Sequence, residues 1–368
     1  MKRASLQFNP AIETLPVYQP GRPIDEVARE LGLQADSIIK LASNENPLGP
    51  SPRAVAAMQQ ALGQLHLYPD GNAFHLKRKL AAALGVEPAN LILGNGSNEI
   101  LEFVGHALMA PGAEVVVSEY CFAVYPIVTR LCGAELVSVP ARQFGHDLPA
   151  MLAAVTPLTR VMFVANPNNP TGTLAAAADV LRLIEQVPPH VLLVMDEAYI
   201  EFLDEPQDLL PLVRRSDRPN LLLTRTYSKI HGLAGTRIGY GIGHPDVIAA
   251  LEKIRQPFNI NSVAQAGAGG ALDDHEHVKR TRRNNSDGLR YFERELAQAG
   301  IEFIPSSANF ILARVGGGER VFEAMQREGV IIRPMGIYHL PEWLRITIGT
   351  PAENGRCLSA LKRALGRA

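Results

Sequence analysis

The hydrophobic positions between residues 41 and 257 fall into short, nearly continuous runs that alternate with stretches of helical period. Runs of this kind are typical of strands that helices cover on both faces. Regular alternation of strands and helices predicts an α/β fold with a mainly parallel, doubly wound sheet. We expect its seven strands at residues 91–93, 114–117, 135–139, 160–164, 191–195, 221–224 and 237–242.

The pattern changes after this region. Residues 262–300 have a helical period with a break near Asp273 and Asp274, and short strands follow. We expect these strands at residues 302–304, 309–314, 330–333 and 344–348, with a helix at residues 319–328. Such a segment is typical of a smaller α+β domain.

The first forty residues contain four prolines before a helical stretch at residues 24–31, which predicts an extended arm. The chain is therefore expected to have an N-terminal arm at residues 1–40 that joins the small domain. A large domain would cover residues 41–260 and a small C-terminal domain residues 261–368.

The composition excludes several classes of protein. Apolar residues make up 46% and charged residues 20%, as in soluble globular proteins, and a net charge of -1 gives no general attraction to nucleic acid or membrane. Three scattered cysteines form neither a disulfide framework nor a zinc pattern, and we expect no metal site. Without a secretory or bilayer-length apolar run, a cytoplasmic location is expected.

Lys229 follows the apolar run 221–224, and ligands gather at the carboxyl ends of strands in an open α/β sheet. An amine there can condense with an aldehyde if its surroundings lower its pKa. Taken alone, however, a loop lysine is more often an ordinary surface residue. Ser228 and Arg237 would add hydroxyl and guanidinium donors beside this amine, which together suit a phosphate.

Asp196 ends the apolar run 191–195, where a buried carboxylate is costly unless it is paired. A protonated ring nitrogen would be such a partner and would make the ring an electron sink. A helix N-cap or a buried ion pair explains a carboxylate there equally well. Tyr199 is near enough in sequence to reach a ring hydroxyl, and Phe122 can stack on a flat ring, although core packing is the commoner use of Phe.

Two turns after other strands can contact a ligand. Residues 166–172 contain two prolines and a glycine, which form a rigid turn that can present the Asn169 amide to a ligand oxygen. Residues 94–99 form a Gly-rich turn before a helix, where free N–H groups and the positive end of the helix dipole suit a phosphate. This turn lacks the third glycine of a dinucleotide-binding fingerprint.

The order of these segments resembles the aspartate-aminotransferase superfamily of pyridoxal-phosphate enzymes, which have fold type I. The shared order is a phosphate turn, an aromatic residue, NPNNPTG, DEAY, SK and an arginine eight residues later, over roughly residues 40 to 350. Within the superfamily the chain resembles the histidinol-phosphate aminotransferases. That resemblance depends on residues 44–47, 68–71, 226–240 and 344–350.

The resemblance implies that Lys229 holds pyridoxal 5′-phosphate as a Schiff base and then moves the substrate's α-proton to the cofactor's C4′ carbon. It implies that Asp196 pairs with the ring nitrogen, and that Tyr199 and Asn169 bond the ring oxygen. Phe122 stands where the family usually has a stacking tyrosine, so this ring could still stack but has no hydroxyl to offer.

The resemblance also implies how the cofactor's phosphate is held. Backbone amides of Gly96 and Ser97 would bind it together with Ser228 and Arg237. Tyr68 would reach it from the other subunit, which implies a homodimer with shared active sites.

On the substrate side, Arg345 would bind an anionic group, and Tyr18 and Asn44 would close over the substrate. The implied reaction transfers the amino group of L-histidinol phosphate to 2-oxoglutarate, giving imidazole acetol phosphate and glutamate. It would run as two half-reactions with ping-pong kinetics. Three alternatives stay open: an aminotransferase for aromatic amino acids, a threonine-phosphate decarboxylase, and a cofactor-binding regulator without activity.

Overall fold

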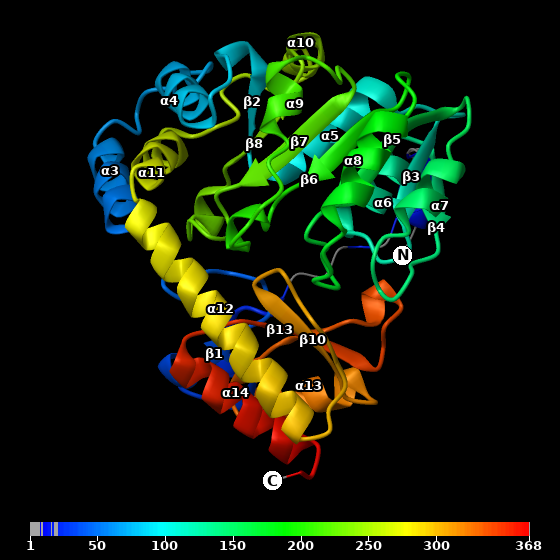
Figure 1. The fold of residues 1–368 in the computed structure, drawn as a ribbon. Coiled ribbons are helices and arrows are strands. Elements are labelled where there is room, and N and C mark those ends of the chain that lie inside the picture. Colours follow the sequence, from blue (N-terminus) through cyan, green and yellow to red (C-terminus); the bar gives the residue numbers. More distant parts are fainter. Residues whose placement is uncertain (1–7, 9, 16, 18–20, 368) are drawn as a thin grey trace.

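The structure is a computed structural model that describes residues 8, 10–15, 17 and 21–367. Its larger part is a seven-stranded sheet between helices, and its smaller part is a four-stranded sheet with helices against it (Figure 1). Helix α12 (His275–Gln298) begins beside α11 (Ser262–Leu272) in the larger part and ends in the smaller one (Figure 1). The break between these two helices lies at Asp273 and Asp274, as the sequence predicts.

The seven-stranded sheet is mainly parallel. Among the described residues, only the two pairs that β8 (Gly239–Gly243) makes with its neighbours are antiparallel. This confirms the predicted α/β class. In order across the sheet the strands are β2 (Leu91–Gly94), β8 (Gly239–Gly243), β7 (Leu221–Thr226), β6 (Leu192–Asp196), β5 (Thr159–Ala165), β3 (Glu114–Ser118) and β4 (Glu135–Val139).

Both faces of this sheet are buried, because successive side chains of a strand point to opposite faces and each face has its own core. In β6, Leu193 and Met195 belong to one core, and Leu192 and Val194 belong to the other. The first core includes residues of α3 (Pro52–Leu62), α4 (Phe74–Leu84), α7 (Leu148–Ala153), α8 (Ala177–Gln186), α9 (Leu210–Arg214) and α11. The second includes residues of α5 (Ser97–Leu108), α6 (Val124–Leu131) and α10 (Pro245–Glu252).

The smaller sheet is antiparallel, and the two faces of one of its inner strands, β13 (Trp343–Thr347), have different surroundings. Leu344 and Ile346 join the core under the helices, whereas Trp343 packs with residues of the larger part. Arg345 alternates with Leu344 and Ile346 and so shares the face of Trp343. The elements are β12 (Arg333–Pro334), β13 (Trp343–Thr347), β10 (Phe310–Arg314), β9 (Phe303–Ile304), α13 (Gly318–Arg327) and α14 (Pro351–Ala364).

The N-terminal segment connects to the smaller part through a two-stranded sheet, in which β1 (Ile39–Lys40) pairs in parallel with β11 (Val330–Ile331). Two helices precede it, α1 (Pro10–Thr14) and α2 (Ile24–Leu31). Short 3₁₀ helices complete the fold: η1 (Ala35–Ser37), η2 (Pro88–Asn90), η3 (Ile200–Phe202), η4 (Ala234–Thr236) and η5 (Gly336–Tyr338).

Three expectations are wrong in detail. The arm is not extended at residues 10–14, because proline is well tolerated in the first turn of a helix. The strand expected at residues 330–333 is two strands with different partners. Arg237 precedes its strand instead of starting it, since its φ of 58° is left-handed and does not fit a strand.

The division of the chain at residues 40 and 260 stays a prediction. Across the described part of the chain, no helix combines the length and the apolar character that a membrane span requires.

Candidate active site

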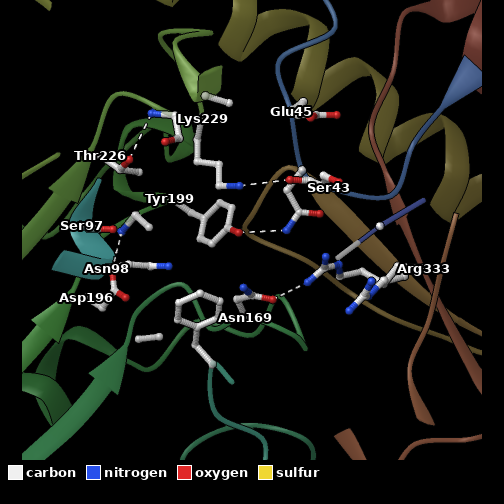
Figure 2. Close-up of a pocket in the computed structure, with 18 of the residues that line it drawn as sticks. Ser43, Glu45, Ser97, Asn98, Asn169, Asp196, Tyr199, Thr226, Lys229 and Arg333 are labelled. Carbon is white, nitrogen blue, oxygen red and sulfur yellow. Dashed lines mark hydrogen bonds between the residues drawn. The ribbon is translucent and has the colours of Figure 1, made fainter. Parts of the chain in front are cut away.

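A cavity of about 380 Å³ collects most of the predicted site residues, which come from both sheets and from the loop after β1. We call the residues at the ends of large-sheet elements the sheet wall: Ser97, Asp196, Ser228, Lys229 and Arg237. We call those from the loop after β1 and from the small sheet the small-domain wall: Asn44, Glu45, Arg333 and Arg345. Figure 2 shows Lys229 and Tyr199 between Ser97 on one side and Arg333 on the other.

Lys229 lies just beyond the end of β7, and its Nζ donates a hydrogen bond to the Ser43 carbonyl at 3.1 Å (Figure 2). Burial, assisted by the positive charge of Arg345, lowers the pKa of this amine to about 8. Loss of water disfavours the ammonium form, so a useful fraction of the amine is neutral near neutral pH. A neutral buried amine is the form that attacks a carbonyl.

Asp196 is the last residue of β6 and is buried. Its Oδ2 accepts a hydrogen bond from the Tyr125 hydroxyl at 2.8 Å, and its Oδ1 accepts one from the Ala198 N–H at 3.2 Å. Burial raises the pKa of this carboxyl, and the bond from Tyr125 opposes the rise. The next residue, Glu197, is instead paired with Arg225 at 2.7 Å, so Asp196 is the carboxylate that faces the cavity.

The turn before α5 is shaped to leave room for an anion. Gly96 has a φ of +81°, and a Cβ on it would collide with the guanidinium of Arg237. That guanidinium donates to the Ser228 Oγ at 3.4 Å and to the Ala234 carbonyl at 3.0 Å. The N-terminus of α5 at Ser97 therefore meets an arginine and a serine, and all three favour a phosphate.

Tyr199 and Asn169 each form a hydrogen bond with a residue of the small-domain wall. The Asn44 Nδ2 donates to the Tyr199 hydroxyl at 2.9 Å, and burial raises the pKa of that hydroxyl to about 12. The Tyr199 hydroxyl keeps its own hydrogen for a further acceptor. Asn169 accepts a hydrogen bond from Arg345 through Oδ1 at 2.5 Å, so its amide N–H groups are the donors that can serve a ligand. Phe122 also lines the cavity.

Two arginines lie side by side on the small-domain wall. Arg333 in β12 and Arg345 in β13 are register partners on adjacent antiparallel strands, and both are buried. The Arg345 Nη2 donates to the Ala42 carbonyl at 3.2 Å. Its Nε is buried and has no hydrogen-bond partner among the described residues. Two buried guanidinium groups on adjacent strands favour the binding of an anion at this place.

Residues 36–361 match the family model described as aminotransferase class I and II. The matched segment includes every residue of both walls. The chain belongs to the class I and II aminotransferases.

Within this aminotransferase family, curated relatives confirm the resemblance to the histidinol-phosphate aminotransferases. Histidinol-phosphate aminotransferase 2 of Nitrosospira multiformis is 51% identical over 355 residues, which are 96% of this chain and 91% of the relative. Histidinol-phosphate aminotransferase 2 of Ralstonia nicotianae is 52% identical over 371 residues, 99% of each. A crystal structure of the Sinorhizobium meliloti histidinol-phosphate aminotransferase in complex with pyridoxal-5′-phosphate has a TM-score of 0.89 at 32% identity and covers 99% of both chains.

Two residues predicted for this aminotransferase site, Gly96 and Tyr68, do not line the cavity, and a third, Tyr18, is outside the described residues. Gly96 is next to the cavity and shapes it through its backbone without lining it. Tyr68 is 83% exposed and stacks on Phe258 at 4.8 Å between ring centroids, away from the cavity of its own chain. Its predicted role in a second subunit stays a prediction.

Sequence reasoning missed several aminotransferase residues. Tyr125 binds Asp196 from the buried face of α6, and no local motif marks it. Arg333 was detectable as an arginine at the end of an apolar run, but only strand pairing brings it beside Arg345. Glu45 directly follows Asn44, which the sequence predicts as a site residue, and this adjacency is the sequence feature that points to Glu45. Ser43, Asn98, Thr226 and Tyr338 also line the cavity.

Proposed function

We propose that this aminotransferase transfers the amino group of L-histidinol phosphate to 2-oxoglutarate, with pyridoxal 5′-phosphate as its cofactor. The products are imidazole acetol phosphate and glutamate, formed in two half-reactions with ping-pong kinetics. Support comes from the names of the relatives and from one observation above all: Lys229, whose pKa is lowered to about 8, shares a cavity with the paired arginines Arg333 and Arg345.

The residues of the sheet wall fit pyridoxal phosphate. The N-terminus of α5 at Ser97, with Ser228 and Arg237, suits the phosphate, and the absence of a Cβ at Gly96 keeps the approach open. Asp196 is a buried carboxylate without an ion-pair partner among the described residues, which a protonated ring nitrogen would supply. Phe122 also lines the cavity and offers an aromatic ring on which the flat ring of the cofactor can stack.

Pyridoxal phosphate, when bound, supplies the electron sink that transamination requires. The chain's own residues then have distinct tasks. Lys229 Nζ accepts the α-proton of the substrate, for which its lowered pKa suits it near neutral pH. Asp196 would accept a hydrogen bond from the ring nitrogen, and Tyr125 holds that carboxylate in position. Tyr199 and Asn169, which line the cavity, would orient the ring through its oxygen.

Arg345 and Arg333 would bind the substrate's anionic group. A phosphate carries close to two negative charges near neutral pH, and two guanidinium groups can meet it with several charge-assisted hydrogen bonds. The same pair would bind a carboxylate of glutamate in the other half-reaction. Arg345 is fixed for this task by Asn169 and by the Ala42 carbonyl.

The active form is proposed to be a homodimer, in which Tyr68 of one chain reaches the phosphate site of the other. The high exposure of Tyr68 in a single chain supports this. Mixing Tyr68→Phe chains with Lys229→Ala chains tests it, because a mixed dimer would contain one intact site. Activity should return on mixing, and no return would contradict shared sites.

The substrate is tested by a coupled assay of the purified protein with histidinol phosphate, phenylalanine and threonine phosphate. The proposal requires that histidinol phosphate has the highest kcat/KM. A preference for phenylalanine would indicate an aromatic aminotransferase, and carbon dioxide released from threonine phosphate would indicate a decarboxylase.

A further inference from the structure

More basic than acidic side chains line the cavity. Its basic side chains are Lys229, Arg237, Arg333 and Arg345, and its acidic side chains are Asp196 and Glu45. Asp196 lies at the end of β6 and already accepts two hydrogen bonds from its own chain. Among the described lining residues, Glu45 is therefore the carboxylate that a substrate can use.

Glu45 belongs to the loop that carries Asn44, whose amide binds Tyr199. The Glu45 side chain is 44% exposed, and its Oε1 accepts a hydrogen bond from Lys40 Nζ at 3.1 Å. Its negative charge also raises the pKa of Lys229 against the effect of burial, so Glu45 acts on the reacting amine across the cavity. A partly exposed ion pair of this kind contributes little to stability, which leaves the carboxylate available for exchange of partners.

The small-domain wall thus has two chemically different parts. Figure 2 shows Glu45 and Arg333 on the same side of the pocket, across from Ser97. Arg333 and its register partner Arg345 favour an anion, and Glu45 favours a hydrogen-bond donor or a cation. Histidinol phosphate has a phosphate at one end and an imidazole N–H at the other. The two arginines therefore suit its phosphate, and Glu45 suits its imidazole N–H.

We propose that Glu45 is a specificity-determining residue that accepts a hydrogen bond from the imidazole ring of the substrate while Arg333 and Arg345 bind its phosphate. This inference rests on the proposed function. The phenyl ring of phenylalanine has no N–H to donate, so it would leave Glu45 without a partner. The second carboxylate of 2-oxoglutarate carries the same charge as Glu45 and gains nothing from it.

The test is Glu45→Gln, which keeps the size of the side chain and removes its charge. We expect kcat/KM for histidinol phosphate to fall by about tenfold, mainly through KM, because the substrate then makes a weaker hydrogen bond to a neutral amide. The KM for 2-oxoglutarate should stay the same or fall, and the rate with phenylalanine should not fall. Glu276→Gln is the matched control, since Glu276 is 82% exposed and pairs with Lys279 on α12, away from the cavity.

A second variant, Lys40→Met, removes the competitor for the carboxylate. It should leave the KM for histidinol phosphate unchanged or lower it, because Glu45 then has one partner fewer. The proposal is overturned if Glu45→Gln reduces the rates with all amino donors equally, which would mean that Glu45 acts only through Lys229. It is also overturned if Lys40→Met raises KM as much as Glu45→Gln. A wild-type protein that does not turn over histidinol phosphate would instead defeat the proposed function itself.

Discussion

The two walls of the cavity are built in different ways. The sheet wall consists of residues at the ends of elements in the large sheet, and one sheet of buried, mainly parallel strands brings them together in space. The small-domain wall is assembled from a loop after β1 and from two strands of another sheet, far apart in sequence. This difference underlies the proposal that the sheet wall carries the chemistry, whereas the small-domain wall selects the substrate.

Lys229→Ala should have the largest effect of any change to the sheet wall. It removes the amine that we propose takes the α-proton, and we expect kcat to fall by roughly 10³-fold or more. The visible absorbance of the lysine-bound cofactor should also disappear. Steady-state kinetics and an absorbance spectrum measure both. Turnover near the wild-type rate would show that the sheet wall does not carry the chemistry.

Asp196→Asn should come next. An amide has nearly the same shape as the carboxylate but lacks the negative charge that is proposed to pair with a protonated ring nitrogen, so kcat should fall by roughly 10²-fold to 10³-fold. The KM values, measured in the same steady-state assay, should change much less. A raised KM with an unchanged kcat would assign Asp196 to binding alone.

Arg345→Ala and Arg333→Ala probe the small-domain wall. Each should raise the KM for histidinol phosphate by roughly 10-fold to 100-fold with a smaller change in kcat, because the anion then has one guanidinium partner instead of two. The Arg345 variant should raise the KM for glutamate as well, since the same site is proposed to serve both substrates. A rise for one substrate only would separate their binding sites.

The pKa of Lys229 links the two walls. Since the neutral amine captures the cofactor, the rate at which the cofactor-free protein takes up pyridoxal phosphate should rise as the pH increases through about 8. The charge of Arg345 helps to lower this pKa, so Arg345→Ala should shift the rise to higher pH. Uptake measured by absorbance on both sides of pH 8 tests this, with the exposed Arg290→Ala as control. An unshifted profile would mean that the walls are electrostatically independent.

Tyr125→Phe should have the smallest effect. It removes one hydrogen bond to Asp196 and leaves the ring stacked on Phe163. We expect kcat to fall by roughly threefold to tenfold in steady-state kinetics, the value of one ordinary hydrogen bond, because Tyr125 acts on the chemistry only through Asp196. A decrease as large as that of Asp196→Asn would mean that Tyr125 contacts the cofactor directly.

The sequence predicts the sheet wall better than the small-domain wall for a physical reason. A buried parallel strand is a continuous apolar run, and a polar residue at its carboxyl end is conspicuous, as Asp196 and Lys229 are. Arg237 was predicted as a site residue but assigned to a strand, because a left-handed φ at a non-glycine residue leaves no sequence signal.

The small-domain wall depends on contacts between distant segments. The resemblance predicts a role for Arg345, whereas the sequence alone assigns none to Arg333 and Glu45, which also line the cavity. The pairing of β12 with β13 decides that two arginines lie together, and hydrophobic periodicity does not determine strand partners. The position of Glu45 similarly follows from the pairing of β1 with β11, two strands that lie near opposite ends of the chain.

The most direct test is a single half-reaction. The cofactor-loaded protein is mixed with L-histidinol phosphate without any 2-oxoglutarate, and the product is measured per chain. The account predicts one equivalent of imidazole acetol phosphate for each chain with Lys229 intact and none for Lys229→Ala. Formation of no keto product by the wild-type protein, or continued turnover without an acceptor, would contradict it.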